Sequence, residues 1–119
     1  MAVIYLACPY SHVDPEVSRR RYVQVTHAAY RLMVQGWTVF SPITHSHPIE
    51  KITGTHQGWE FWEAQDLPIL RKSDVLGILC LEGWQYSKGV KAELEEARRL
   101  ALPVLFFSPT ELLRPEELE

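Results

Sequence analysis

The first candidate for chemistry is an acidic residue, Glu93, in a segment whose apolar residues recur at helical spacing. On a helical wheel with about 100° per residue, Glu93 falls inside the apolar arc formed by Val90, Leu94 and Ala97. A carboxylate aimed at the core needs a partner or a function, because desolvating an unpaired carboxylate costs several kcal/mol. We interpret Glu93 either as a boundary residue paired with Lys88 or an arginine, or as a nucleophile or general base.

A second carboxylate, Asp66, follows two tryptophans, Trp59 and Trp62, in another helical stretch. A helix that packs Trp62 and Leu70 inward can turn Asp66 toward the same crevice. Two carboxylates that face each other across a pocket can act as nucleophile and acid/base in glycosidic chemistry. Asp74 directly precedes an apolar strand, so we interpret it as a local cap or ion pair.

Ser87 and Gly89 open the helix that carries Glu93. A serine beside free helical N–H groups and a glycine makes a small site for an anion or a hydroxyl group, although a simple helix cap explains the serine equally well. The chain has neither a GxGxxG fingerprint nor a P-loop lysine motif. We therefore predict no cofactor.

Three histidines, His45, His47 and His56, follow the second expected strand. They are compatible with a zinc site, with hydrogen-bond donors to a sugar or a base, or with a solvent-exposed loop. Because no regular element is expected to fix them, the spacing is weak evidence for a metal, and we predict no metal site. The two cysteines, Cys8 and Cys80, lack the spacing of a metal motif and are interpreted as buried thiols.

The elements that must position these residues alternate between strands and helices. We expect strands at 2–7, 37–41, 74–81 and 103–107, helices at 14–36, 55–72 (broken near Pro68) and 87–102, a loop at 42–55, and a capping box at 108–111. This alternation predicts a three-layer α/β/α fold with a parallel sheet of about four strands. For this sheet we take the strand order to be 2-1-3-4. Ligands bind such sheets where the strand order reverses, here beyond the carboxyl ends of the first and third strands.

Composition limits the classes of protein that the chain can represent. Its 119 residues fit a single domain spanning 1–119, and 46% hydrophobic with 23% charged residues is a globular composition. A net charge of -3 argues against a nucleic-acid polymer as partner. The first residues have neither a basic start nor a long apolar run, so we expect no signal peptide, no membrane association and a cytoplasmic protein.

The order and spacing of several short motifs resemble a known family. The motifs are Tyr5-Leu-Ala-Cys-Pro-Tyr10, Ser41-Pro-Ile43, Asp66 with Ser73-Asp74, Ser87-x-Gly89-Val90-x-x-Glu93-x-x-x-Ala97, and Leu102-Pro103-Val104. Together they cover about residues 3 to 107 and resemble the nucleoside 2-deoxyribosyltransferase superfamily, which includes the deoxynucleoside 5'-monophosphate N-glycosidases. An uncharacterised bacterial branch of that superfamily is the nearest match.

The resemblance implies a flavodoxin-like fold and a set of catalytic roles. Glu93 corresponds to the nucleophile that attacks the anomeric carbon, and Asp66 to the carboxylate that helps to protonate the departing base. Tyr5 matches the tyrosine that orients the nucleophile, and Ser87 the residue that contacts a 5'-phosphate. We therefore expect cleavage or transfer at the N-glycosidic bond of a (deoxy)nucleoside or its 5'-monophosphate.

The remaining expected substrate contacts are Gly89, Cys8, Pro9 and Tyr10 of the first loop, and Pro42 and His45 after the second strand. Cys8 stands where the family often has glycine, and so does Glu95, two residues after the expected nucleophile. The family implies a homo-oligomer, because its members commonly complete their sites with a neighbouring subunit. Two alternative functions are a non-catalytic nucleotide-binding or regulatory module and a metal-dependent hydrolase that uses the three histidines.

Overall fold

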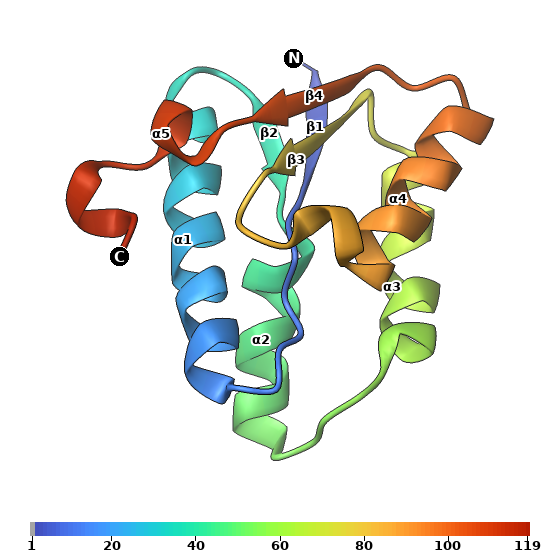
Figure 1. The fold of residues 1–119 in the computed structure, drawn as a ribbon. Helices are drawn as coiled ribbons and strands as arrows, with labels where there is room; N and C mark the ends of the chain where they lie inside the picture. Colours follow the sequence, from blue (N-terminus) through green and yellow to red (C-terminus); the bar gives the residue numbers. More distant parts are fainter. Residues whose placement is uncertain (1) are drawn as a thin grey trace.

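A computed structural model describes residues 2–119, in which strands and helices alternate along the chain (Figure 1). A three-residue 3-10 helix, Trp84–Tyr86, precedes α4, and a second one, Pro115–Glu117, lies near the C-terminus. The strands and α-helices are β1 (Val3–Ala7), α1 (Pro15–Val34), β2 (Thr38–Phe40), α2 (Pro42–Thr53), α3 (Trp59–Arg71), β3 (Val75–Leu79), α4 (Lys88–Arg99), β4 (Val104–Phe107) and α5 (Pro109–Leu112).

The four strands form one parallel sheet in the order β2-β1-β3-β4, which confirms the predicted topology. Tyr5 of β1 is opposite Phe40 of β2 on one side and Leu76 of β3 on the other. β1 and β3 are apolar throughout because they are central strands covered on both faces, which is typical of parallel sheets. The fold is a compact α/β fold of the flavodoxin-like type.

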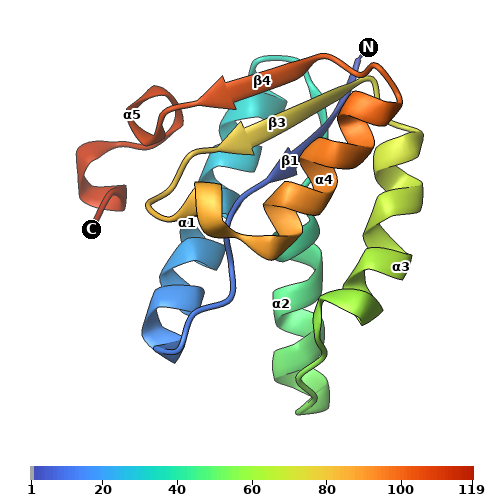
Figure 2. The same cartoon turned by 45° about the vertical axis from the view of Figure 1, so that its right-hand side comes forward.

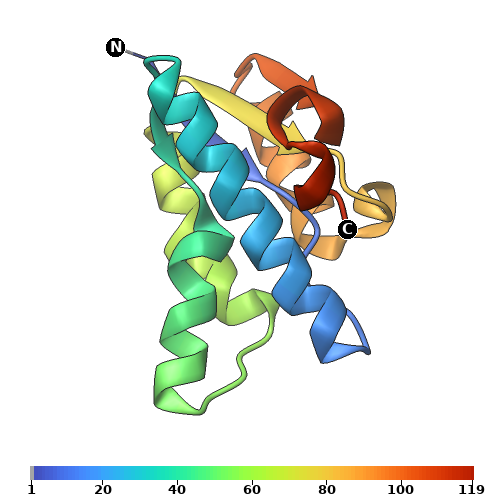
Figure 3. The same ribbon diagram turned by 90° about the vertical axis from the view of Figure 1, so that its left-hand side faces the viewer.

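Helices cover both faces of the sheet, and the alternation of β1 divides the core in two. Ile4 and Leu6 point to the face covered by α1 and α5, seen from the side of α1 in Figure 3. Tyr5 and Ala7 point to the opposite face, covered by α3 and α4, which Figure 2 brings forward. Tyr5 therefore starts in the same layer as the helix that carries Glu93.

Local capping explains where the helices next to the sheet begin. The Asp14 carboxylate accepts from the backbone N–H of Glu16 at 3.0 Å, and Pro15 occupies the first helical position. The Ser87 hydroxyl oxygen accepts from the backbone N–H of Val90 at 3.2 Å and caps α4. Both helices begin within one residue of the predicted starts.

The prediction of a loop at 42–55 is wrong, because most of this segment is the helix α2. Ser41 caps it by accepting from the backbone N–H of Thr44 at 3.4 Å, and Pro42 occupies the first turn. Gly54 ends it in the left-handed region with φ of 72°. Pro48 lies inside the helix, where it removes one backbone donor.

The predicted break of α3 near Pro68 is also wrong, since the helix runs unbroken to Arg71. Ala64, whose carbonyl loses its helical donor at Pro68, is exposed, so solvent can satisfy that oxygen. α3 also begins at Trp59, later than the predicted residue 55. Among the described residues, no helix combines the length and apolar character that crossing a bilayer requires.

Candidate functional site

A cavity of about 620 Å³ lies beyond the carboxyl ends of β1 and β3. Its walls come from the loops that follow these strands, from the start of α4, and from α2 and the first half of α3, which extend past the end of β1 in Figure 1. This is the place where the strand order reverses, as the predicted topology required. The volume is in the range of small-molecule sites.

Glu93 projects from the second turn of α4 into this cavity and is only 4% exposed. The fully buried Tyr5 hydroxyl donates a hydrogen bond to Glu93 Oε2 at 2.5 Å. Burial raises the pKa of the Glu93 carboxyl from 4.5 to about 8, although the Tyr5 hydrogen bond lowers it. The wheel correctly placed Glu93 toward the sheet; its partner is Tyr5 rather than Lys88 or an arginine.

Asp66 reaches the same cavity from α3 and is also 4% exposed. Within the described chain, its Oδ1 atom is buried without a hydrogen-bond partner. Burial raises the pKa of Asp66 from 3.8 to about 6, and the charge of Asp66 contributes to the raised pKa of Glu93. Two buried carboxyl groups with raised pKa values therefore line one cavity.

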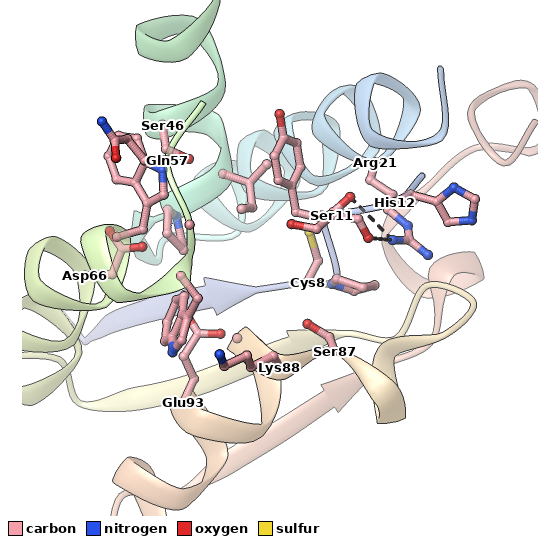
Figure 4. A pocket seen from close by; sticks show the side chains of 18 of the residues that line it. Cys8, Ser11, His12, Arg21, Ser46, Gln57, Asp66, Ser87, Lys88 and Glu93 are labelled. Atoms are coloured by element: carbon pink, nitrogen blue, oxygen red, sulfur yellow. Dashed lines mark hydrogen bonds between the residues drawn. The ribbon is translucent and has the colours of Figure 1, made fainter. Parts of the chain in front are cut away.

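The two ends of the cavity differ in character (Figure 4). Ser11, His12 and Arg21 lie toward one end, whereas Gln57 and Asp66 lie toward the other, together with Ser46. We call the first the cationic end, because it includes the Arg21 guanidinium. We call the second the aromatic end, because two tryptophans of α3 line the cavity there.

Arg21 is held in place at the cationic end by main-chain carbonyl groups. Its guanidinium donates to the carbonyl oxygens of Ser11 at 3.2 Å and Glu82 at 2.9 Å. Of the arginines at the start of α1, Arg19 instead pairs with Glu16 on the surface. Arg21 is thus the member of that run that lines the cavity.

The aromatic end contains functional candidates that sequence reasoning missed. Trp59 and Trp62 of α3 line it, together with Gln57 and with Ser46 and Glu50 of α2. The exposed Lys88 and Glu60 side chains, 3.2 Å apart, join the starts of α4 and α3 beside this end. The missed signals were Ser41, which caps α2, and Gly54, which ends it.

Most of the predicted substrate contacts line the cavity, and one does not. Those that line it are Cys8, Pro9, Tyr10, Pro42, Ser87 and Gly89. Tyr5 lies behind Glu93 and contacts it without lining the cavity. His45 was placed wrongly, because α2 turns it away from the cavity, where its exposed ring lies 6.0 Å from that of Phe40.

The other histidines do not converge either. His47 is buried, hydrogen-bonded through Nδ1 to the Tyr10 hydroxyl at 2.5 Å and stacked on Tyr22 with ring centroids 4.0 Å apart. Burial lowers the pKa of His47. His56 is exposed at the cavity rim. Over residues 2–119, no group of three or more histidine, cysteine and acidic side chains is placed to hold a metal ion.

The two cysteines are free thiols with different surroundings. Cys8 is buried and lines the cavity, and burial strongly raises the pKa of its thiol, so it stays protonated. Cys80 is half-buried, which corrects the prediction that both are buried. Asp74 accepts from the backbone N–H of Val3 at 2.7 Å, and so joins β1 instead of forming a local cap or ion pair.

The cavity residues are spread along the chain from Cys8 in the first loop to Glu93 in α4. A comparison with curated proteins finds no match. The family model described as a domain of unknown function, DUF1937, matches residues 2–109, and the chain belongs to this family.

Proposed function

We propose that the protein cleaves or transfers the N-glycosidic bond of a (deoxy)nucleoside or nucleoside 5'-monophosphate. The observation that carries the proposal is that two buried carboxyl groups open on one cavity: Glu93, hydrogen-bonded to Tyr5, and Asp66, whose Oδ1 has no hydrogen-bond partner among residues 2–119. The motif resemblance to the nucleoside 2-deoxyribosyltransferase superfamily supports the same activity. The aromatic end offers two indole rings to a heterocycle, and the cationic end offers Arg21 to the sugar side of the substrate.

In the proposed reaction, a Glu93 carboxylate oxygen attacks C1' of the sugar. The bond between C1' and the base nitrogen breaks, and the base leaves with the proton of Asp66. The resulting glycosyl ester on Glu93 is then resolved by water, which gives the free sugar, or by a second base, which gives a new nucleoside. Asp66 takes back the proton of the incoming water or base.

The proposed roles require Glu93 to be ionised while Asp66 is protonated. Because the pKa of Glu93, about 8, lies above that of Asp66, about 6, this arrangement is the minor form of the singly protonated pair. The rate is then expected to be highest between about pH 6 and 8 and to fall on both sides. The hydrogen bond from Tyr5 matters because it stabilises the reactive, ionised form of Glu93.

The test is release of free base from a panel of deoxynucleosides and their 5'-monophosphates. Wild type is expected to release base from at least one of them, and Glu93→Gln to lose this activity. Glu95→Gln is the matched control, because Glu95 is an exposed carboxylate two residues away on the same helix. If wild type releases no base from any substrate with water or a second base as acceptor, the catalytic proposal is wrong.

The elevated pKa of Glu93 favours one alternative, a non-catalytic nucleotide-binding or regulatory module. A neutral carboxyl can hydrogen-bond a sugar hydroxyl but is a poor nucleophile. This alternative predicts that a nucleotide stabilises the protein against heat without being consumed. The expected stabilisation is about 2.7 kcal/mol when the ligand is at a hundred times its dissociation constant.

A further inference from the structure

We infer that Glu50 is a positioning residue that fixes the aromatic end of the cavity as the wall facing the base of the substrate. This inference rests on the proposed function and assigns a role to a buried carboxylate that takes no part in the proposed reaction. Glu50 lies on α2 and is 9% exposed.

The Glu50 carboxylate joins α2 to the α2–α3 connection and to α3. Its Oε2 atom accepts two hydrogen bonds, from the backbone N–H of Gln57 at 2.7 Å and from the indole Nε1–H of Trp62 at 3.0 Å. His56 Nδ1 lies 3.9 Å from the other oxygen. One side chain of α2 thus anchors both the α2–α3 connection and the first turns of α3.

The anchored groups belong to the aromatic end of the cavity. Trp62 and Gln57 both line it, and Trp62 lies one turn before Asp66 on the same face of α3. An indole whose N–H is held by a buried carboxylate has lost most of its rotational freedom before any ligand arrives. A base that stacks on such a ring therefore incurs a smaller entropic cost on binding.

Both hydrogen bonds use Oε2, so this atom of Glu50 is engaged with the protein while the residue also lines the cavity. The positioning role is that Glu50 acts on the base through the anchored Trp62 ring and the Gln57 main chain. Replacing Glu50 should therefore weaken the binding of ligands that carry a base. The binding of a sugar phosphate without a base should be unaffected.

The first measurement needs no ligand. The indole N–H resonance of Trp62 is assigned in ¹⁵N-labelled wild type by its loss in Trp62→Phe, and is then followed in Glu50→Leu and Glu50→Gln. Glu50→Leu removes the acceptor, so the resonance is expected to shift upfield and its hydrogen exchange to accelerate. Glu50→Gln keeps a carbonyl oxygen and should remain near wild type. An unchanged resonance in Glu50→Leu would overturn the inference.

The second measurement compares the dissociation constants of two kinds of ligand. The first kind carries a base and comprises the 5'-monophosphates of 2'-deoxyadenosine, 2'-deoxyguanosine, 2'-deoxycytidine and thymidine; the second is 2-deoxyribose 5-phosphate, which has no base. All variants also carry Glu93→Gln, which prevents turnover. Glu50→Leu is expected to weaken binding of the best nucleotide about fivefold or more and to leave the sugar phosphate within about twofold. Equal losses for both ligands, or no loss for the nucleotide, contradict the positioning role. Trp62→Phe keeps a smaller aromatic ring at this position but removes the indole donor, so it should reproduce the selective loss even where Glu50→Leu does not fold.

The two proposals fail in different ways. If wild type neither binds nor cleaves any of the four nucleotides, the proposed function is wrong, and the anchoring of Trp62 is judged by its indole resonance alone. If nucleotides bind or are cleaved but Glu50→Leu lacks the selective loss, the proposed function stands and the positioning role is wrong.

Discussion

Replacing Glu93 by glutamine is expected to stabilise the protein increasingly as the pH rises. Burial raises the pKa of Glu93 from 4.5 to about 8, so the folded protein keeps a proton that the unfolded chain releases. Between these pH values the unfolded state binds fewer protons than the folded state, and the free energy of unfolding must fall as the pH rises. Glutamine does not titrate, yet its carbonyl oxygen can still accept the hydrogen bond from Tyr5.

The size of the effect follows from the displacement of the pKa. One pKa unit corresponds to about 1.4 kcal/mol, which is also the slope per pH unit for one proton. The contribution of Glu93 to the free energy of unfolding is therefore intact below pH 4.5. It falls by roughly 3 kcal/mol at pH 7 and by roughly 5 kcal/mol above pH 8.

The assay is urea-induced unfolding, followed by circular dichroism at several pH values between 4.5 and 9. The difference in free energy of unfolding between Glu93→Gln and wild type should grow with pH, whereas the exposed control Glu95→Gln should track wild type. Subtracting the curves removes the titration of groups that do not interact with Glu93, such as His47. Parallel curves for wild type and Glu93→Gln would show that Glu93 does not titrate as a buried acid.

Three further predictions follow from the site and its scaffold. Tyr5→Phe removes the hydrogen bond that lowers the pKa of Glu93. The alkaline limb of the pH profile of kcat/KM should therefore shift to higher pH, and the maximum of kcat/KM should fall. An unchanged profile would exclude this role of Tyr5. Gly77→Ala places a Cβ 2.8 Å from Ile4 Cδ1 and 3.0 Å from Phe107 Cε2. This overpacking should lower the free energy of unfolding by about 1–3 kcal/mol and lower the melting temperature. An unchanged melting temperature would mean that the two neighbouring side chains move aside without cost. Dialysis against EDTA should leave base release unchanged, and a loss restored by zinc would revive the metal-dependent alternative.

The succession of strands and helices and the burial of Glu93 could be predicted because apolar periodicity reports directly on them. β1 and β3 are continuous apolar runs, and the wheel of α4 has one acid inside its apolar arc. The capping residues Asp14 and Ser87 then located the starts of α1 and α4. These features are local, so the sequence alone was sufficient.

The helix α2 could not be predicted from periodicity because the face it buries is mainly polar. Ser46 and Glu50 point into the cavity and His47 packs against Tyr22, at buried positions where an ordinary helix would place apolar residues. The internal Pro48 also favoured a loop. The capping residue Ser41 and the left-handed Gly54 were the available signals for the ends of a helix. The helix forms between them even though Pro48 lies inside it.

The contacts of the aromatic end could not be predicted because they join distant parts of the chain. The bond from Trp62 to Glu50 depends on how α2 and α3 pack, and no sequence spacing reports that distance. The pairing of Tyr5 with Glu93 spans 88 residues and entered the sequence-based argument only through the family resemblance. For His45 the predicted contact was wrong because the assumed loop is a helix.

The most direct test of the central claim is to identify the residue that becomes glycosylated. Wild type and Glu95→Gln are incubated with a 2'-fluoro-arabino nucleotide, whose fluorine slows the second step, and the peptides are analysed by mass spectrometry. The account predicts the mass of the fluorosugar on the peptide containing Glu93, and its absence in Glu93→Gln. Base release by Glu93→Gln at the wild-type rate, or an adduct on another residue, would contradict the proposed role of Glu93.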